Sequence, residues 1–185
     1  MEKQTYFTER NYKNLEKLKE LNKELPYFVN EFFIGNADSL TPLTKLGYAQ
    51  DFKCFFYFLI TEVPEFSGLK MQDLNYSHLN MLTQSHIEQF LNYLSSYKTS
   101  DGKILSNETK TKSRKFASIR ALLKYFFKKD KITSNVADKV NPPKLREKEI
   151  IRLEVDEVSN LLNEVESGQN LTKNEKIFHK ITEKR

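Results

Sequence analysis

The chain has 185 residues, of which 38% are hydrophobic and 30% charged, a composition typical of a globular protein with a real core. It lacks the uninterrupted apolar run of about 18 residues that a membrane span needs, and its first residues, MEKQTYFTERNYKN, lack the apolar segment of a secretory signal, so we expect a cytoplasmic protein. The single cysteine, Cys54, excludes an internal disulfide. It lies in the aromatic stretch DFKCFFYFL, which favours a buried and unreactive thiol.

Positive charge is concentrated in one segment. The net charge is only +5, yet eleven of the thirty Lys and Arg residues and only three of the twenty-five acids lie between Lys98 and Lys131. Such a segment is typical of a surface that binds a polyanion. A solvated, lysine-rich helix would give the same count, and that alternative stays open at this point.

Five Gly, five Pro and little alternation of β-branched residues predict an all-α fold, an orthogonal bundle of four to five helices with an extra helix before it and a helical tail after it. We expect the first helix to follow Thr8, with apolar residues at spacings of three and four. These are Leu15, Leu18, Leu21 and Leu25. Pro26 is then expected to open a short helix that ends near Gly35.

A long helix is predicted after Pro42 and is expected to end near Pro64 and Gly68. Its apolar face consists of Tyr48, Phe52, Phe55, Phe56 and Leu59. Thr83 is a predicted N-cap for the next helix. The buried stripe of that helix consists of Ile87, Phe90, Leu91 and Leu94.

A turn at Asp101-Gly102 leads to the basic segment NETKTKSRKFASIRALLKYFFKK, residues 107–129. Its apolar residues are expected on one side of a helix: Phe116, Ile119, Leu123, Phe126 and Phe127. The other side carries Thr111, Arg114, Ala117, Ser118, Ala121 and Tyr125. Its small residues would let the helix approach a DNA groove, with Arg114, Lys115 and Lys124 beside them as donors and the helix N-terminus near Thr109 favouring phosphate. Small residues also suit close packing of helices, which is the alternative.

A second candidate surface lies in SLTPLTKLGYAQDFK, where Thr41, Thr44 and Lys45 offer donors near a helix N-terminus. Ser or Thr before a helix also serves as an ordinary cap. The three histidines, His78, His86 and His179, are too scattered for a metal site or a catalytic triad, and surface or capping positions are expected for them.

The end of the chain has a different character. A short helix is expected from Val136 to Val140, followed by Asn141-Pro142-Pro143 and the charged connector LREKEIIRLE. Two amphipathic pieces follow. The first contains Val155, Val158, Leu161 and Leu162, and the second Ile177, Phe178 and Ile181. We therefore divide the chain into an N-terminal helix at 1–25, a helical domain at 26–140 that carries the basic segment, and a linker with a helical tail at 141–185.

Taken together, TPLTKLGYAQDFKCFFYFL, LTQSHIEQFLNYL, SNETKTKSRKFASIRALLKYFF and NPPK with the linker into LEVDEVSNLL resemble the N-terminal core-binding (SAM-like) domain of the tyrosine recombinases, the phage integrase and Xer-like enzymes. The preceding helix and LPYFVNEFF resemble the single-recombinase Xer type called XerS. The similarity covers nearly all of residues 26–162 as a pattern over four helices.

The resemblance implies a domain that forms half of a C-shaped clamp around double-stranded DNA and meets the major groove with the helices around Thr44 and Arg114. It implies DNA contacts by Thr44, Lys45, Lys112, Arg114, Lys115, Ser118 and Arg120. Helical geometry places Arg120 nearer the apolar side, where it could instead pair or snorkel. Together with the residue-based candidates, the predicted DNA-binding set is Thr41, Thr44, Lys45, Thr109, Lys112, Arg114, Lys115, Ser118, Arg120 and Lys124.

Enzymes of this family cleave DNA with a Tyr hydroxyl that is supported by Arg, Lys and His residues of a C-terminal catalytic domain. All nine tyrosines of this chain lie at or before Tyr125, and ITEKR resembles the start of that domain, so we expect the catalytic residues to be absent from this chain. No cofactor or metal is expected; duplex DNA and further recombinase protomers are the expected partners, with no membrane. The alternatives are a stand-alone, non-catalytic DNA-binding protein, and a helical interaction module with an acidic partner.

Overall fold

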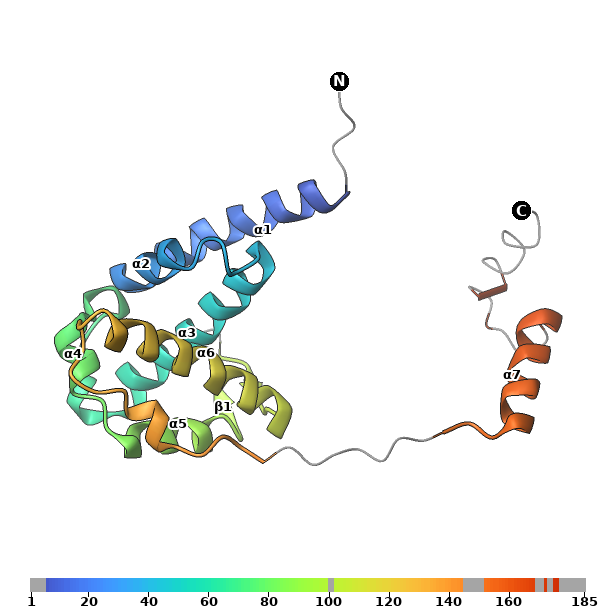
Figure 1. The fold of residues 1–185 in the computed structure, drawn as a ribbon. Helices are drawn as coiled ribbons and strands as arrows, with labels where there is room; N and C mark the ends of the chain where they lie inside the picture. Colours follow the sequence, from blue (N-terminus) through green and yellow to red (C-terminus); the bar gives the residue numbers. More distant parts are fainter. Residues whose placement is uncertain (1–5, 100–101, 145–151, 169–171, 173–174, 177–185) are drawn as a thin grey trace, which may run out of the picture. The chain divides into compact units, whose positions relative to one another are not determined.

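The computed structural model describes residues 6–99, 102–144, 152–168, 172 and 175–176, and the chain divides into two compact units, residues 1–145 and 146–185. The described part of the first unit is helical apart from one small hairpin (Figure 1). Its helices are α1 (Tyr6–Asn22), α2 (Tyr27–Gly35), α3 (Pro42–Glu62), α4 (Tyr76–Asn80), α5 (Gln84–Tyr93) and α6 (Thr109–Lys128). The 3₁₀ turns η1 (Pro64–Phe66), η2 (Met71–Asp73) and η3 (Val136–Lys139) complete it. The predicted all-α fold is confirmed.

Local sequence signals explain where several helices begin. Pro26 precedes α2, and Thr41 caps α3 by accepting a hydrogen bond from the Thr44 amide, with Pro42 in the first turn. Thr83 caps α5 as predicted. The Thr41 and Thr83 side chains satisfy backbone N–H groups that a helix start otherwise leaves unpaired, whereas Pro26 makes no such hydrogen bond.

The core is built largely from phenylalanine. Among the described residues, eight phenylalanines are essentially inaccessible to solvent: Phe28, Phe52, Phe55, Phe56, Phe66, Phe90, Phe116 and Phe126. Their rings meet mostly edge to face, the geometry that aromatic quadrupoles favour. Phe28 of α2 and Phe126 of α6, for example, have centroids 5.6 Å apart and planes at 84°. Helices far apart in sequence are thus held together by aromatic contacts.

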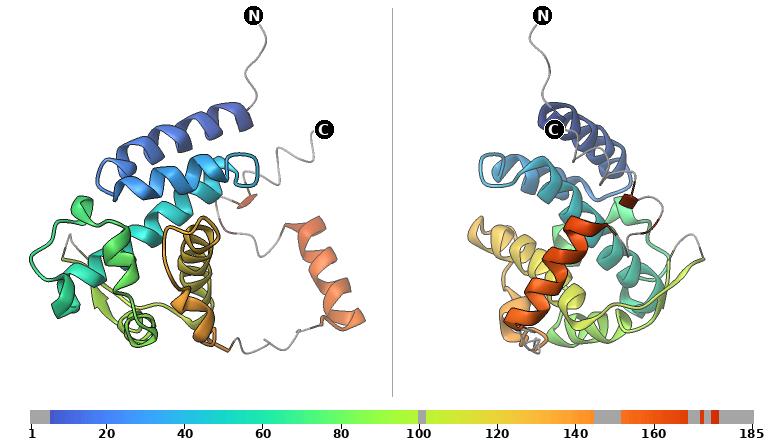
Figure 2. Two further views of the ribbon diagram at one scale, coloured as in Figure 1. Left: turned by 60° about the vertical axis from the view of Figure 1, so that its left-hand side comes forward. Right: turned by 90° about the vertical axis from the view of Figure 1, so that its right-hand side faces the viewer.

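Several elements pack against α6. It packs on α3, α2 and η3, while α1 packs along α3 and also contacts α2 (Figures 1 and 2). α3 therefore lies between α1 and α6 and links the two sides of the unit. Its first half is the part that lies closest to the exposed side of α6, because Arg114 reaches Gly47 and Asp51.

The predicted helix start, the predicted core and the predicted turn need one correction each. α1 already includes Tyr6 to Thr8, so Thr8 does not precede it. The side chains of Leu15 and Phe127, expected in the core, are 39% and 44% exposed, and Leu122 takes a core position instead. A hairpin of β1 (Tyr97–Lys98) and β2 (Ile104–Leu105) stands on either side of the predicted turn, with Tyr97 opposite Leu105.

The second unit contains α7 (Val155–Ser167), preceded by a capping box of Glu154 and Glu157 and followed by Gly168 in the left-handed region. Its apolar side chains, predicted to need a partner, are exposed at Val155, Val158, Leu161 and Leu162. The predicted piece at Ile177, Phe178 and Ile181 lies outside the described residues. In the part of the chain that the structure describes, no helix combines the length and apolarity of a membrane span.

Candidate nucleic-acid interface

One row of residues runs along the solvent side of α6. The row consists of Lys110, Arg114, Ala117, Ala121, Lys124 and Lys128, which follow one another at spacings of four and three and so share a helix face. All are exposed except Ala121, which is partly buried. We call this row the α6 stripe. It has cationic side chains at both ends and short alanine side chains in the middle.

Arg114 is the cation that α3 holds in place. Its Nη1 and Nη2 donate to the two carboxylate oxygens of Asp51 at 2.6 and 2.8 Å. The Asp51 side chain is fully buried, whereas that of Arg114 remains 54% exposed. Lys115 approaches the same carboxylate, with Nζ 3.3 Å from Oδ1, and its side chain is only 11% exposed. One buried carboxylate thus has two cationic partners, which is how a buried charge is tolerated.

Other cations of the basic segment also have partners. Lys112 donates to the Ser95 hydroxyl at 2.6 Å, and Arg120 binds Asp138 at 3.0 Å while lying over the Phe116 ring. The pairing considered for Arg120 in the sequence is therefore what the structure shows. In contrast, no acidic side chain among the described residues lies within ion-pair distance of Lys110, Lys124 or Lys128. These three lysines, like Lys98, Lys103 and Lys131 of the same segment, remain available to attract a polyanion.

The expected outward orientation of Ser118 is wrong. Its side chain is fully buried, and its hydroxyl donates to the Lys115 carbonyl at 2.7 Å. Because α6 packs against α2, α3, α4 and η3, its buried arc extends past Ser118 and only a narrow face remains outside. Ala117 is exposed as predicted, and Ala121 lies at the edge of the core. Tyr125 is also turned inward, with its ring against Phe32.

The second predicted surface mainly caps α3. The Thr41 and Thr44 hydroxyls are 2.8 Å apart and hydrogen-bonded to each other, and Thr41 also accepts from the Thr44 amide. Lys45 donates to the Ala37 carbonyl at 3.4 Å. The ordinary capping role that the sequence left open accounts for both threonines. Their use in DNA binding stays a prediction.

The start of α6 lacks the side-chain cap that the start of α3 has. Thr109 is the first helical residue, and Glu108 at the cap position makes no side-chain hydrogen bond to the first turn. Amide groups at a helix start favour anions, but the Glu108 carboxylate beside them opposes a phosphate. A phosphate contact at Thr109 therefore stays a prediction, and the negative charge of Glu108 next to it works against that contact.

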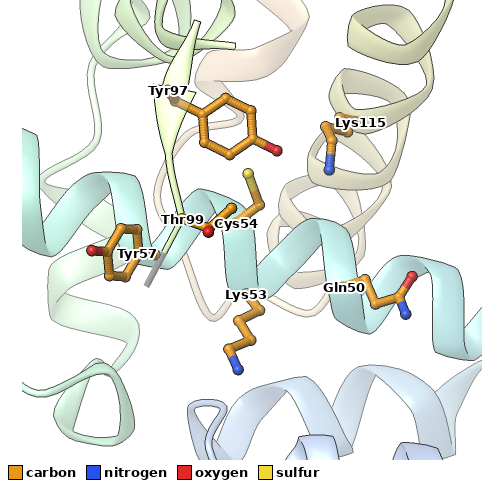
Figure 3. Close-up of a pocket in the computed structure, with 7 residues that line it drawn as sticks. All are labelled: Gln50, Lys53, Cys54, Tyr57, Tyr97, Thr99 and Lys115. Atoms are coloured by element: carbon orange, nitrogen blue, oxygen red, sulfur yellow. The ribbon is translucent and has the colours of Figure 1, made fainter. Parts of the chain in front are cut away.

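Asp51, Arg114 and Lys115 form a group that we call the Asp51 cluster. A hollow of about 410 Å³ lies beside it, between α3, α6 and β1. It is lined by Gln50, Lys53, Cys54, Tyr57, Tyr97, Thr99 and Lys115. Figure 3 shows the ends of Tyr97 and Lys115 converging on Cys54, while Lys53 points away from them. Burial raises the pKa of the Cys54 thiol, and the Lys115 ammonium offsets part of that rise. The thiol is thus kept protonated, which agrees with the low reactivity predicted from the sequence, but Cys54 is only partly buried and not buried as expected.

Two of the histidines have capping roles, as expected. The Nδ1 of His78 accepts from the Asn75 amide and that of His86 from the Thr83 amide, each inside a capping box. His179 lies outside the described residues. Among the residues that the structure describes, no three His, Cys, Asp or Glu side chains gather in a way that could hold a metal.

Comparison with known proteins adds a second line of argument. The chain is 26% identical over 149 residues to tyrosine recombinase XerC of Caldanaerobacter subterraneus subsp. tengcongensis, an alignment that covers 77% of this chain and 40% of the relative. The chain is distantly related to the tyrosine recombinases. It spans well under half the length of that relative. No family model matches the chain, and no solved structure matches it.

Asp51, the residue that gathers the two cations, was not predicted from the sequence. A signal was present, since Asp51 is an acid inside the aromatic stretch GYAQDFKCFFYF. An acid on a buried helix face needs a cationic partner, and the nearby basic helix was the obvious source.

Proposed function

We propose that this chain is the DNA-binding portion of a tyrosine-type site-specific recombinase and that it meets duplex DNA through the α6 stripe. The observation that carries the proposal is the exposure of Lys110, Lys124 and Lys128 on one helix face without a nearby acid among the described residues. The distant relation to the tyrosine recombinases supports it.

The face suits a DNA groove in shape as well as in charge. Ala117 and Ala121 keep the middle of the stripe low, so that the helix can approach closely, while lysines at both ends reach the phosphates. In the proposed role the domain forms half of a clamp and works beside other protomers on the DNA. Strand cleavage would need a catalytic domain that carries the nucleophilic Tyr. α1 and the α2 segment LPYFVNEFF support the finer proposal of the single-recombinase Xer type.

The first prediction tests the stripe by charge removal. Lys124→Ala/Lys128→Ala should weaken duplex binding and lower the slope of log K against log salt by about 0.9 for each phosphate that the protein no longer neutralises. Fluorescence anisotropy with a labelled duplex over a salt series measures both quantities.

The matched control is Lys13→Ala/Lys17→Ala, which also removes two exposed lysines, but from α1. It changes the net charge equally and should leave the slope close to that of the wild type. Equal decreases in affinity in both double variants would mean that binding follows net charge alone, and the stripe would not be the interface. No binding of duplex by the wild-type chain would overturn the proposed function.

A further inference from the structure

The Asp51 cluster lies directly behind the α6 stripe. Asp51 is on α3 and Arg114 on α6, and the carboxylate and guanidinium join end to end through two hydrogen bonds of 2.6 and 2.8 Å. A fork of this kind fixes the plane of the guanidinium as well as its position. Exposed arginines otherwise sample many rotamers, so Arg114 is unusual among the cations of this face.

Small neighbours keep Arg114 accessible. A Cβ placed on Gly47 would lie 3.9 Å from Arg114 Nη1, so the guanidinium lies over a part of α3 that has no side chain. Ala117, one turn further along α6, is exposed and short. Asp51 accepts one N–H from each terminal nitrogen, and the remaining donors of the guanidinium can point outward.

The charges suggest which DNA group these donors meet. Asp51 occupies two donors of Arg114 and offsets part of its positive charge, so Arg114 attracts a phosphate less strongly than an unpaired lysine does. Lys110, Lys124 and Lys128 are better suited, because each is a flexible point charge. A guanidinium held in a fixed plane matches the O6 and N7 acceptors of guanine, which lie side by side in the major groove.

We propose that Asp51 is a positioning residue that fixes Arg114 to read a guanine in the major groove. The inference rests on the proposed DNA-binding function and adds to it a specificity-determining pair. Lys115 completes the cluster from the buried side, where its ammonium makes the second charge interaction of the same carboxylate.

The test is selection of bound duplexes from a library with a randomised central segment, using the full chain. Wild-type protein should enrich a G·C pair at one position of the site. Asp51→Asn and Arg114→Lys should both lose that preference by roughly 5- to 150-fold, because neither retains the charged fork. Arg114→Lys keeps the charge and should keep the salt slope. A purely electrostatic role of Arg114 predicts instead that this variant keeps both the slope and the base preference.

Asp138→Asn is the matched control, since it also deprives an arginine, Arg120, of its carboxylate. It should retain the guanine preference. Unchanged preference in Asp51→Asn or in Arg114→Lys would overturn the proposal, and so would duplex binding by the wild type without any base preference. Failure of the wild type to bind duplex is a different result, because it overturns the proposed function itself.

Asp51→Asn leaves the Lys115 ammonium buried without its carboxylate, so folding is checked by thermal melts. Asp51→Asn/Lys115→Met removes that buried charge and keeps a side chain of similar length, and it should show the same loss of guanine preference. If neither Asp51 variant folds, retention of the preference by Arg114→Lys still overturns the proposal, and its loss supports the guanine contact of Arg114 on which the positioning role depends.

Discussion

Ala117 and Ser118 are adjacent residues of α6 with opposite surroundings. Ala117 is exposed on the stripe, whereas Ser118 is fully buried and donates to the Lys115 carbonyl. Replacing each by Leu adds similar bulk in two different places. Ser118→Leu should overpack the core and lower the free energy of unfolding by about 1–3 kcal/mol.

Ala117→Leu should change the free energy of unfolding by less than about 0.5 kcal/mol, because it adds bulk at the surface. It should weaken duplex binding, since a larger side chain prevents close approach of the stripe. Urea melts and anisotropy on the two variants check both effects. Wild-type affinity of Ala117→Leu would mean that this part of α6 does not face DNA.

At the scale of single residues, the sequence predicted which residues cap helices or lie exposed better than it predicted which side chains pair with one another. The basic helix, the exposed Ala117 and the capping residues Thr83 and Pro26 follow from local rules that depend on a few neighbours in the chain. The pairing of Asp51 with Arg114 joins residues that are 63 positions apart. No helical periodicity contains that information, because it depends on how α3 and α6 cross.

α2 and α6 make a contact that offers a test at the scale of the elements. A Cβ on Gly35, the last residue of α2, would lie 1.9 Å from Tyr125 Oη and 2.6 Å from Tyr125 Cζ. Tyr125 donates to the Glu31 carbonyl, and its ring packs edge to face on Phe32. Gly35→Ala should therefore displace a whole ring and cost about 1–3 kcal/mol of the free energy of unfolding.

Gly47→Ala is the matched control, because Gly47 lies inside α3 and its added Cβ would meet nothing closer than 3.9 Å. Without a clash, the helix preference for Ala should raise the free energy of unfolding by up to about 1 kcal/mol. Chemical denaturation of the two variants should thus give changes of opposite sign. A stabilised Gly35→Ala would show that Tyr125 can leave its place without cost.

Long elements could be predicted from the sequence more reliably than short ones. The long helices α3 and α6 carry enough apolar repeats to show their period, whereas β1 and β2 have two residues each and show no alternation. The error at Ser118 has another cause. A helical wheel places it beside the exposed side, but α6 packs against α2, α3, α4 and η3, so the buried arc is wider than the apolar residues alone indicate.

For the whole molecule, the predicted helical class holds, and the distant relation to the tyrosine recombinases agrees with the resemblance read from the sequence. The compact unit of residues 1–145 includes α1, which packs along α3. A separate helix of residues 1–25 could be predicted from its apolar spacing. Its packing partner could not be, because that partner is set by the tertiary arrangement of the helices.

Partly buried tyrosines make the stability of the first unit sensitive to alkaline pH. Burial raises the pKa of Tyr76, Tyr93 and Tyr97, and at Tyr76 the carboxylate of Glu31 raises the pKa further. A raised pKa means that the folded chain holds the phenolic proton more tightly than the unfolded chain does. The stability from these groups is therefore fully present below the unfolded pKa of about 10 and is lost as pH rises toward the folded values.

We expect the urea midpoint to change little between neutral pH and about pH 9 and to fall steeply above about pH 10. The thiol of Cys54, whose pKa burial also raises, adds a smaller decrease that begins near pH 8.5, its usual range. Tyr76→Phe keeps the ring and removes the titrating hydroxyl, so its midpoint should fall less steeply over the alkaline range. A wild-type midpoint that stays constant up to about pH 11, or a Tyr76→Phe profile parallel to that of the wild type, would show that the Tyr76 hydroxyl does not couple ionisation to folding.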